Sequence, residues 1–210
     1  MNSKRNCVIL LTVALFANVA IKAADEAKPV VAIQAIVVGD ALPAFESVDD
    51  TGKVWKSSEH IGKSMIVMYF YPGDFTGGCI RQAQAYRDGL EKIESLGVEV
   101  VGVSGDEAAT HSLFKKTFGL KHGLLSDTKG ELAKILGVPV SKGGQVRPID
   151  ADRKPLLDAE GKPMMLPRPV TLARWTIVAD RDGKIVSIRE VKNPAADIET
   201  VLKMVQGLEK

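Results

Sequence analysis

Apolar residues from Asp40 onward alternate between short continuous runs and helical periods, which is the pattern of an α/β domain. Residues 65–71 are apolar or aromatic at every position and are followed by Pro72, as expected for a strand covered on both faces. Residues 98–103 predict a second buried strand. Together with the helical period between them, these two segments predict a βαβ unit with a parallel pair of strands.

The helix between these strands is predicted to begin near Cys79, because apolar residues recur from there at intervals of three and four residues until Gly97. The same periodicities predict further elements: a helix at 107–118 closed by Gly119, a strand around Leu124, a helix at 127–136, and a hairpin of residues 174–179 and 184–190 around Asp182–Gly183. Asn193 and Pro194 predict the start of a final helix with one apolar face.

Residues 139–172 differ from the rest of the chain in composition. They hold six of its ten prolines, a density that few helices survive, so we predict an irregular insert. Inside it, residues 158–161 predict an extra hairpin turn. A chain of 210 residues, of which 45% are hydrophobic, is long enough for one sizeable core. The predicted organisation is therefore a single domain at residues 38–210 that contains this insert.

The first residues have the composition of an export signal. Two basic residues are followed by an apolar run at residues 7–21 and then by two alanines. At ~1.5 Å per residue the run spans about 22 Å, which is short of a ~30 Å hydrocarbon core. We therefore predict a cleaved signal at residues 1–23, a short lead at 24–37, and export to the periplasm or the extracellular space. An uncleaved signal that anchors the chain in a membrane is the alternative.

The whole chain has a net charge of +2, and the predicted signal carries the positive charges of Lys4, Arg5 and Lys22. Its removal therefore leaves a chain close to neutral. A chain without a basic excess lacks the electrostatic footprint of a nucleic-acid-binding protein. Removal also takes away Cys7 and leaves Cys79 as the single cysteine. Cysteines of exported proteins usually come in pairs, so an odd one is a candidate reactive thiol.

The surroundings of Cys79 determine whether this thiol can react. The thiolate is the nucleophile, and an unperturbed cysteine with a pKa of ~8.5 is only a few per cent ionised at pH 7. The predicted helix start favours the anion through its unpaired N–H groups and its macrodipole. Gly77 and Gly78 let the backbone approach closely, and Thr76 can cap the helix or bind a ligand. On these grounds alone, a lone cysteine at a helix start is more often an inert small hydrophobic residue.

Pro72, Thr76 and Cys79 stand in the spacing P-x-x-x-T-x-x-C, within YFYPGDFTGGC. This motif resembles the signature of the peroxiredoxins, the AhpC/TSA family, and the resemblance extends from Val38 to about Lys210 apart from the insert. The most similar subgroups are the bacterioferritin-comigratory or Q-type and the one-cysteine alkyl hydroperoxide reductase E type. The resemblance implies a thioredoxin-like α/β fold, with a central mixed sheet flanked by helices.

The resemblance also implies roles for four residues: Cys79 as peroxidatic nucleophile, Thr76 as a hydroxyl that positions the peroxide, Pro72 as a lid over the thiolate, and Arg174 as the active-site guanidinium. The implied activity is a thiol-dependent peroxidase that reduces hydrogen peroxide and organic hydroperoxides through a sulfenic acid, without a cofactor or metal. An arginine suits this site, because its rigid donor fork stays charged and can face the oxygen on which negative charge grows. Without the resemblance, Arg174 would be taken for a solvated surface residue.

Two positions depart from the family pattern. Gln82 stands three residues after the cysteine, where many relatives carry a glutamate that orients the arginine, and a neutral amide holds an arginine less strongly. Gln84 stands five residues after it, where many Q-type members have their resolving cysteine. The resemblance therefore implies the one-cysteine type, rescued by an external thiol or a thioredoxin-like reductant, and leaves homodimerisation open.

Two other functions are compatible with the sequence. A thioredoxin-fold protein without peroxidase activity would dock a partner through the proline-rich insert. A cysteine hydrolase would need a histidine base beside Cys79. However, His60, His111 and His122 show no ligand-like spacing with each other or with the cysteine, so all three are predicted to be structural.

Overall fold

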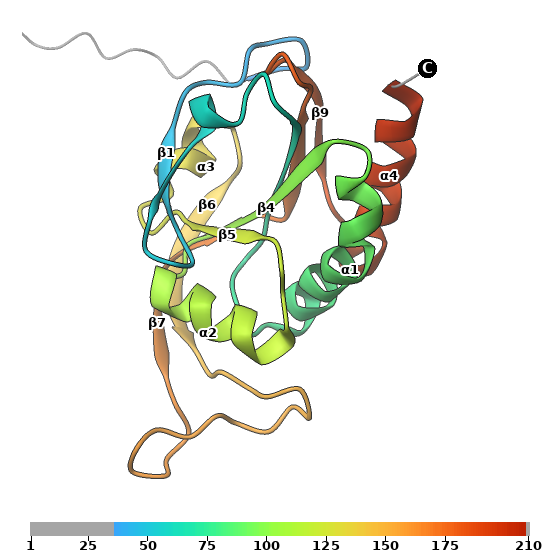
Figure 1. The fold of residues 1–210 in the computed structure, drawn as a ribbon. Coiled ribbons are helices and arrows are strands. Elements are labelled where there is room, and N and C mark those ends of the chain that lie inside the picture. The colour runs from blue at the N-terminus through green and yellow to red at the C-terminus, as the bar shows by residue number, and fades with distance from the viewer. Residues whose placement is uncertain (1–35, 209–210) are drawn as a thin grey trace, which may run out of the picture. The chain divides into compact units, whose positions relative to one another are not determined.

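The computed structural model describes residues 36–208 (Figure 1). The predicted signal at 1–23 and the lead up to residue 35 lie outside the described residues. Within them, seven strands form a mixed sheet in the order β2-β1-β5-β4-β3-β8-β9, and β6 and β7 form a separate two-stranded sheet. The strands are β1 (Glu46–Asp49), β2 (Val54–Lys56), β3 (Met65–Phe70), β4 (Val98–Ser104), β5 (Gly123–Ser126), β6 (Val140–Val146), β7 (Leu166–Leu172), β8 (Trp175–Ala179) and β9 (Ile185–Glu190). The helices are α1 (Gly77–Glu94), α2 (Ala108–Phe118), α3 (Glu131–Ile135) and α4 (Asp197–Leu208), with 3-10 turns η1 (Ser57–Glu59) and η2 (Pro194–Ala196).

β3 lies in the interior of the sheet, and every one of its residues is buried. It pairs in parallel with β4, the strand that follows α1, and antiparallel with β8. The predicted buried strand and the parallel pair are therefore confirmed, with the strand ending at Phe70. An uninterrupted apolar run suits this position, because a strand at the centre of such a sheet is covered on both faces.

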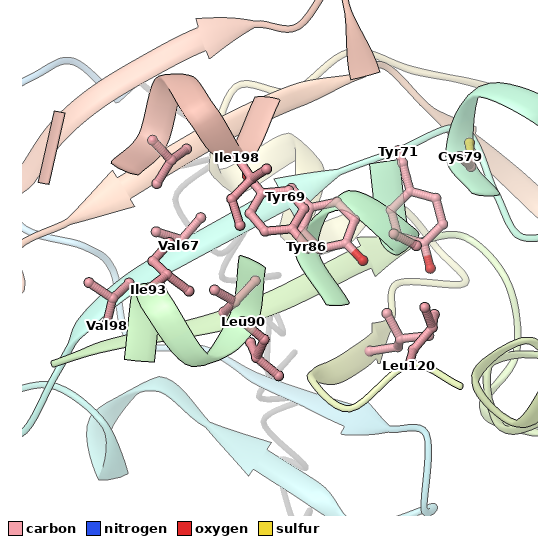
Figure 2. Close-up of a cluster of buried hydrophobic side chains, with 14 of the residues drawn as sticks. Val67, Tyr69, Tyr71, Cys79, Tyr86, Leu90, Ile93, Val98, Leu120 and Ile198 are labelled. Carbon is pink, nitrogen blue, oxygen red and sulfur yellow. The ribbon is translucent and has the colours of Figure 1, made fainter. Parts of the chain in front are cut away.

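Alternate residues of β3 point to opposite faces of the sheet and build two apolar clusters. Val67 and Tyr69 belong to the cluster that α1 and α4 cover, where Tyr69 stacks on Tyr86 of α1 with ring centroids 4.5 Å apart (Figure 2). Ile66 and Met68 belong to the other cluster, which includes residues of α3. The predicted α/β class, a mixed sheet flanked by helices, is confirmed.

The end of α2 and the hairpin near the C-terminus also agree with the prediction. α2 ends with Gly119 in the left-handed region at φ 63°. β8 and β9 form the predicted hairpin, closed by backbone hydrogen bonds between Asp180 and both Gly183 and Lys184. No helix within residues 36–208 has the length and apolar character that a membrane crossing requires.

The predicted starts of two helices are wrong. The sequence predicts a helix at 127–136, but α3 has only five residues, because Gly130 adopts φ 66° and the Asp127 carboxylate accepts backbone N–H groups from the first turn of α3. The sequence also predicts a final helix capped by Asn193. Asn193 makes no side-chain cap, the next three residues form the turn η2, and α4 begins only at Asp197.

The two ends of the proline-rich insert form regular strands, while residues 147–165 between them contain no regular strand or helix. β6 and β7 pair antiparallel, and the segment between them makes two turns, one at residues 150–153 and one at 158–161, where the extra turn was predicted (Figure 1). Pro167 and Pro169 are tolerated in β7 because each strand of a two-stranded sheet has one free edge. Prolines at alternate positions can direct their missing N–H groups to that edge. Proline density alone therefore excluded helices correctly but not strands.

Candidate active site

Cys79 is the third residue of α1 and has only 1% of its surface exposed. The first hydrogen bond of the helix runs from the Ile80 N–H to the Thr76 carbonyl, so the N–H groups of residues 77–79 have no acceptor within the helix. These groups and the helix dipole favour a negative charge on the sulfur. The predicted helix start near Cys79 is confirmed.

Arg174 reaches Cys79 because of the register between β3 and β8. Phe70 pairs with Trp175, so the last residue of β3 lies beside the first residue of β8. From there, Nη2 of Arg174 donates a hydrogen bond to Sγ of Cys79 over 3.2 Å. Gly78 leaves room for this approach, because a Cβ at that position would lie 3.1 Å from the same nitrogen. The fold thus brings together two predicted residues that are 95 positions apart in the sequence.

Gln82 holds the other terminal nitrogen of Arg174. Nη1 donates to Oε1 of Gln82 at 2.5 Å, and Nε2 of Gln82 donates to Oδ2 of Asp197 at 2.8 Å. A carboxylate only accepts hydrogen bonds, so Asp197 selects the amide nitrogen and leaves the amide oxygen for the arginine. The neutral residue that departs from the family pattern is therefore fixed in the one orientation that supports Arg174.

Asp197 is the centre of a buried hydrogen-bond network behind the site. Its Oδ2 also accepts the hydroxyls of Tyr86 at 2.9 Å and Thr176 at 2.8 Å, and its Oδ1 pairs with the Arg189 guanidinium. As the first residue of α4, Asp197 also lies where the helix dipole favours a negative charge. Burial and then the Asp197 carboxylate raise the pKa of Tyr86 well above 10.0, so its hydroxyl remains a donor.

Thr76 and Pro72 lie in the loop between β3 and α1. Thr76 directly precedes the helix, but its hydroxyl donates to the Gly73 carbonyl at 3.3 Å and makes no cap, so the predicted capping contact is absent. Pro72 is partly exposed. In the part of the chain that the structure describes, Arg174 is the only hydrogen-bond partner of the Cys79 sulfur.

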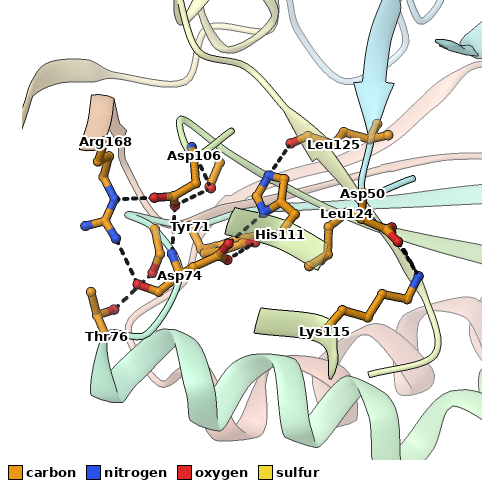
Figure 3. A network of polar contacts seen from close by, with 12 residues as sticks. Asp50, Tyr71, Asp74, Thr76, Asp106, His111, Lys115, Leu124, Leu125 and Arg168 are labelled. Carbon is orange, nitrogen blue, oxygen red and sulfur yellow. Dashed lines mark hydrogen bonds and ion pairs between the residues drawn. The ribbon is translucent and has the colours of Figure 1, made fainter. Parts of the chain in front are cut away.

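A second buried polar network lies beneath this loop (Figure 3). The Asp74 carboxylate accepts the Tyr71 hydroxyl and Nδ1 of His111, each at 2.8 Å, while Nε2 of His111 lies 3.2 Å from the Leu125 carbonyl. Both partners of the imidazole are acceptors, so both ring nitrogens carry hydrogen and His111 is a cation. Burial lowers the pKa of His111, but the carboxylates of Asp74 and then Asp106 outweigh it, and the net effect raises the pKa above 6.5.

The other two histidines have structural partners as well. Nδ1 of His60 lies 2.6 Å from Glu99, and Nε2 of His122 lies 2.7 Å from the Tyr69 hydroxyl. Burial lowers the pKa of His122 to about 3, so this histidine is neutral. A cysteine hydrolase would need a histidine beside its nucleophile, but all three histidines form their hydrogen bonds with residues other than Cys79. Within residues 36–208, no group of three or more histidine, cysteine, aspartate or glutamate side chains is placed to hold a metal ion.

Sequence reasoning named Gln82 but missed Asp197, which bonds to Gln82, and Arg168, which bonds to the loop. Asp197 carried one usable signal: it stands four residues before Val201, on the apolar face of the final helix, where an acid is out of place. An acid in a first turn is also an ordinary helix start, so this signal was weak. Arg168, which joins the insert to Asp106 and to the loop, had no signal in the sequence.

The chain is similar to several known proteins. Residues 38–188 match the AhpC/TSA family. Peroxiredoxin Q, chloroplastic, of Populus jackii is 36% identical over 171 residues, covering 81% of this chain and 68% of that protein. The putative peroxiredoxin Q, chloroplastic, of Oryza sativa subsp. indica is 44% identical over 106 residues, about half of either chain (50% and 48%). The crystal structure of peroxidoxin BcpB from Mycobacterium tuberculosis superposes with a TM-score of 0.65 at 25% identity, covering 82% of this chain and 98% of that one.

The family match and the peroxiredoxin Q relatives define the class as thiol-dependent peroxidases, and the buried Cys79 thiol beside Arg174 fits that class. The chain belongs to the AhpC/TSA family, as its motif predicted. The matched solved structure also confirms the predicted thioredoxin-like fold.

Proposed function

We propose that Cys79 is the peroxidatic nucleophile of this chain and reduces hydrogen peroxide and organic hydroperoxides. Its thiolate attacks the terminal oxygen of ROOH, so that an S–O bond forms and the O–O bond breaks. Cys79 becomes a sulfenic acid, and the departing RO⁻ takes up a proton and leaves as ROH. The observation that carries this proposal is the 3.2 Å hydrogen bond from Arg174 to the sulfur at the start of α1.

Arg174 has two tasks in this reaction. In the resting site its positive charge favours the thiolate over the thiol. As the O–O bond breaks, charge grows on the departing oxygen, and a preorganised guanidinium beside the sulfur can donate to it. The hydrogen bond to Gln82 supports this role, because it fixes the guanidinium before the peroxide arrives.

Thr76 and Pro72 take supporting roles in the proposed site. The Thr76 hydroxyl, three residues before the sulfur, would position the peroxide, and its bond to the Gly73 carbonyl at 3.3 Å is long enough to be exchanged for one to the substrate. Pro72 has no N–H group and a rigid ring, which suits a lid that limits the access of water to the thiolate.

The enzyme is of the one-cysteine type, so an external thiol must reduce the oxidised Cys79 directly. Cys7 lies in the segment predicted to be removed, and Gln84 stands where a resolving cysteine would be expected. A first thiol converts the sulfenic acid into a mixed disulfide and water, and a second thiol releases the disulfide RSSR. The reductant is a small thiol or a thioredoxin-like protein, and a homodimer is compatible with this cycle.

The proposed compartment follows from the composition of the first 23 residues, which supports export to the periplasm or the extracellular space without stable membrane insertion. The two relatives from Populus and Oryza are named as chloroplastic, which is a different destination. The mass of the protein purified from its own compartment tests this point, because cleavage near Ala23 or Ala24 gives a defined loss.

Peroxide consumption and intact mass of the processed protein test the function. Stoichiometric peroxide should add one oxygen that a dimedone-type reagent traps, excess peroxide should add two, and thiol should restore only the first product. Cys79→Ser should abolish turnover while the fold is kept, because serine offers no comparable anion at neutral pH. A parent chain that stays unoxidised under excess peroxide would refute the proposal and leave a binding module as the function.

A further inference from the structure

Arg168 of β7 joins the β6–β7 hairpin to the catalytic loop, defined here as residues 72–76 (Figure 3). Its Nε donates to Oδ1 of Asp106 at 3.0 Å, and its Nη2 donates to the backbone carbonyl of Asp74 at 2.8 Å. The Arg168 side chain is 10% exposed and the Asp106 side chain is fully buried. A buried guanidinium with two directed hydrogen bonds is held in one geometry.

Both backbone polar groups of Asp74 form hydrogen bonds with the Arg168–Asp106 ion pair. The carbonyl accepts from Arg168, and the N–H donates to Oδ2 of Asp106 at 2.7 Å. Asp74 lies between β3 and α1, outside the hydrogen-bond ladders of the sheet and the helix. Buried backbone groups need partners, and here the partners come from the insert and from the residues after β4.

The conformation of the catalytic loop requires such support. A Cβ at Gly73 would lie 2.0 Å from Nε of Arg168, so only glycine allows the guanidinium to lie against the backbone. Phe75 has a φ of 58°, an unfavourable conformation for an aromatic residue. A backbone of this kind persists only where its surroundings hold it in place.

We propose that Arg168 is a positioning residue, through which the β6–β7 hairpin clamps the catalytic loop and so sets the place of Cys79 at the start of α1. The proposal rests on the proposed function of Cys79 and adds a task for the insert. Arg168 makes no hydrogen bond to the sulfur, whose partner is Arg174. The guanidinium acts through Asp74, which precedes Cys79 by five residues.

The clamp should matter because the loop leads directly into the helix start. A misplacement of about 1 Å in a reacting group can cost on the order of 100-fold in rate. Without the Arg168 guanidinium, Asp106 would have no ion-pair partner from β7, and the Asp74 carbonyl would lose its hydrogen-bond donor. The loop should then sample other conformations while the seven-stranded sheet, which contains neither β6 nor β7, stays intact.

The test compares Arg168→Met with Arg147→Met, a matched control at an exposed arginine of the same hairpin. Two quantities are measured: the second-order rate constant for oxidation of Cys79 by hydrogen peroxide, and hydrogen–deuterium exchange of the backbone of residues 73–79. Arg168→Met should slow oxidation about 10- to 100-fold and speed exchange in residues 73–79, with β3 and β4 unchanged. Arg147→Met should match the parent protein. Arg168→Lys, which keeps the charge and loses the fork, should fall between the two.

Parental oxidation rates and parental exchange in Arg168→Met would overturn the clamp. A rise in exchange that extends equally over β3 and β4 would also overturn it, because it indicates general destabilisation. If Arg168→Met does not fold, the same two measurements on Arg168→Lys decide the question. A parent protein that does not react with peroxide would refute the proposed function alone, since the exchange measurement still tests the clamp.

Discussion

Arg174 directs its two terminal nitrogens to different partners, Nη2 to the sulfur of Cys79 and Nη1 to the oxygen of Gln82. A planar guanidinium can make both bonds at once because its donors are fixed in a fork. A lysine ammonium has a comparable charge on a single nitrogen. Replacement of Arg174 by lysine would therefore keep the positive charge but remove one of the two hydrogen bonds, which distinguishes the effect of charge from the effect of orientation.

Arg174→Lys should slow the oxidation of Cys79 about 10- to 100-fold without abolishing it. The loss of one hydrogen bond to a charged group is worth ~1.5–3 kcal/mol, and each ~1.4 kcal/mol is a factor of ten in rate. The profile of Cys79 alkylation against pH should move to higher pH, because the thiolate loses its best-placed donor. Rapid mixing with peroxide and with an alkylating reagent measures both effects.

Arg181→Lys is the matched control, since Arg181 is an exposed arginine in the turn between β8 and β9. It should leave the oxidation rate and the alkylation profile unchanged. If Arg174→Lys gives the same result as this control, Arg174 has no part in the reaction.

At the scale of elements, Gln82 and Asp197 connect α1 to α4 through one amide. The first residue of α4 orients a side chain on α1, which in turn orients the arginine that precedes β8. Many relatives of this family carry a glutamate at the position of Gln82. Such a carboxylate would face the Asp197 carboxylate across the same 2.8 Å gap, where two buried negative charges repel each other.

Gln82→Glu should therefore impair this protein although it restores the residue that is common in the family. We expect a loss of about 1–3 kcal/mol in the free energy of unfolding and slower oxidation of Cys79, because one carboxylate must bind a proton or the two must separate. Adding Asp197→Asn should recover part of both losses, since the asparagine amide can donate to the new carboxylate. Urea unfolding and peroxide kinetics on both variants measure these effects, and full stability and rate in Gln82→Glu would contradict the expectation.

The sequence predicted the elements whose pattern is local and continuous. β3 and α1 follow from an unbroken apolar run and a regular helical period, and the family resemblance led to Cys79 and Arg174, which the fold brings together. The two strands at the ends of the insert were not predicted, because proline excludes helices but not the free edge of a two-stranded sheet. α3 was predicted too long because Asp127 bonds to the first turn from outside the helix.

The supporting residues of the site could not be predicted for a different reason. Asp197 and Arg168 act through partners 115 and 94 positions away, and no local pattern encodes such contacts. Thr76 shows the same limit on a smaller scale. Its position predicts a cap, but the strained loop brings the Gly73 carbonyl within reach of its hydroxyl.

For the whole molecule, two buried histidines couple stability to pH with opposite signs. The pKa of His111 in the fold is raised above 6.5, so its contribution is fully present below pH 6.5 and is lost as the pH rises through the raised value. The pKa of His122 in the fold is lowered to about 3, so its contribution is fully present above pH 6.5 and is lost as the pH falls towards 3. Acidification should therefore destabilise the fold through His122 while His111 remains a cation.

His122→Gln isolates the second effect, because glutamine can bond to the Tyr69 hydroxyl and does not titrate. Between pH 7.5 and pH 5 the parent protein should lose about 2 kcal/mol more free energy of unfolding than the variant, since each pH unit below 6.5 costs ~1.4 kcal/mol while the folded histidine stays neutral. His111 and the carboxylates are common to both proteins, so their titration cancels in the comparison. Urea unfolding at the two pH values gives the difference directly. Equal pH dependence in parent and variant would mean that His122 is protonated in the folded protein at pH 5, and that the buried space around Tyr69 admits a charge.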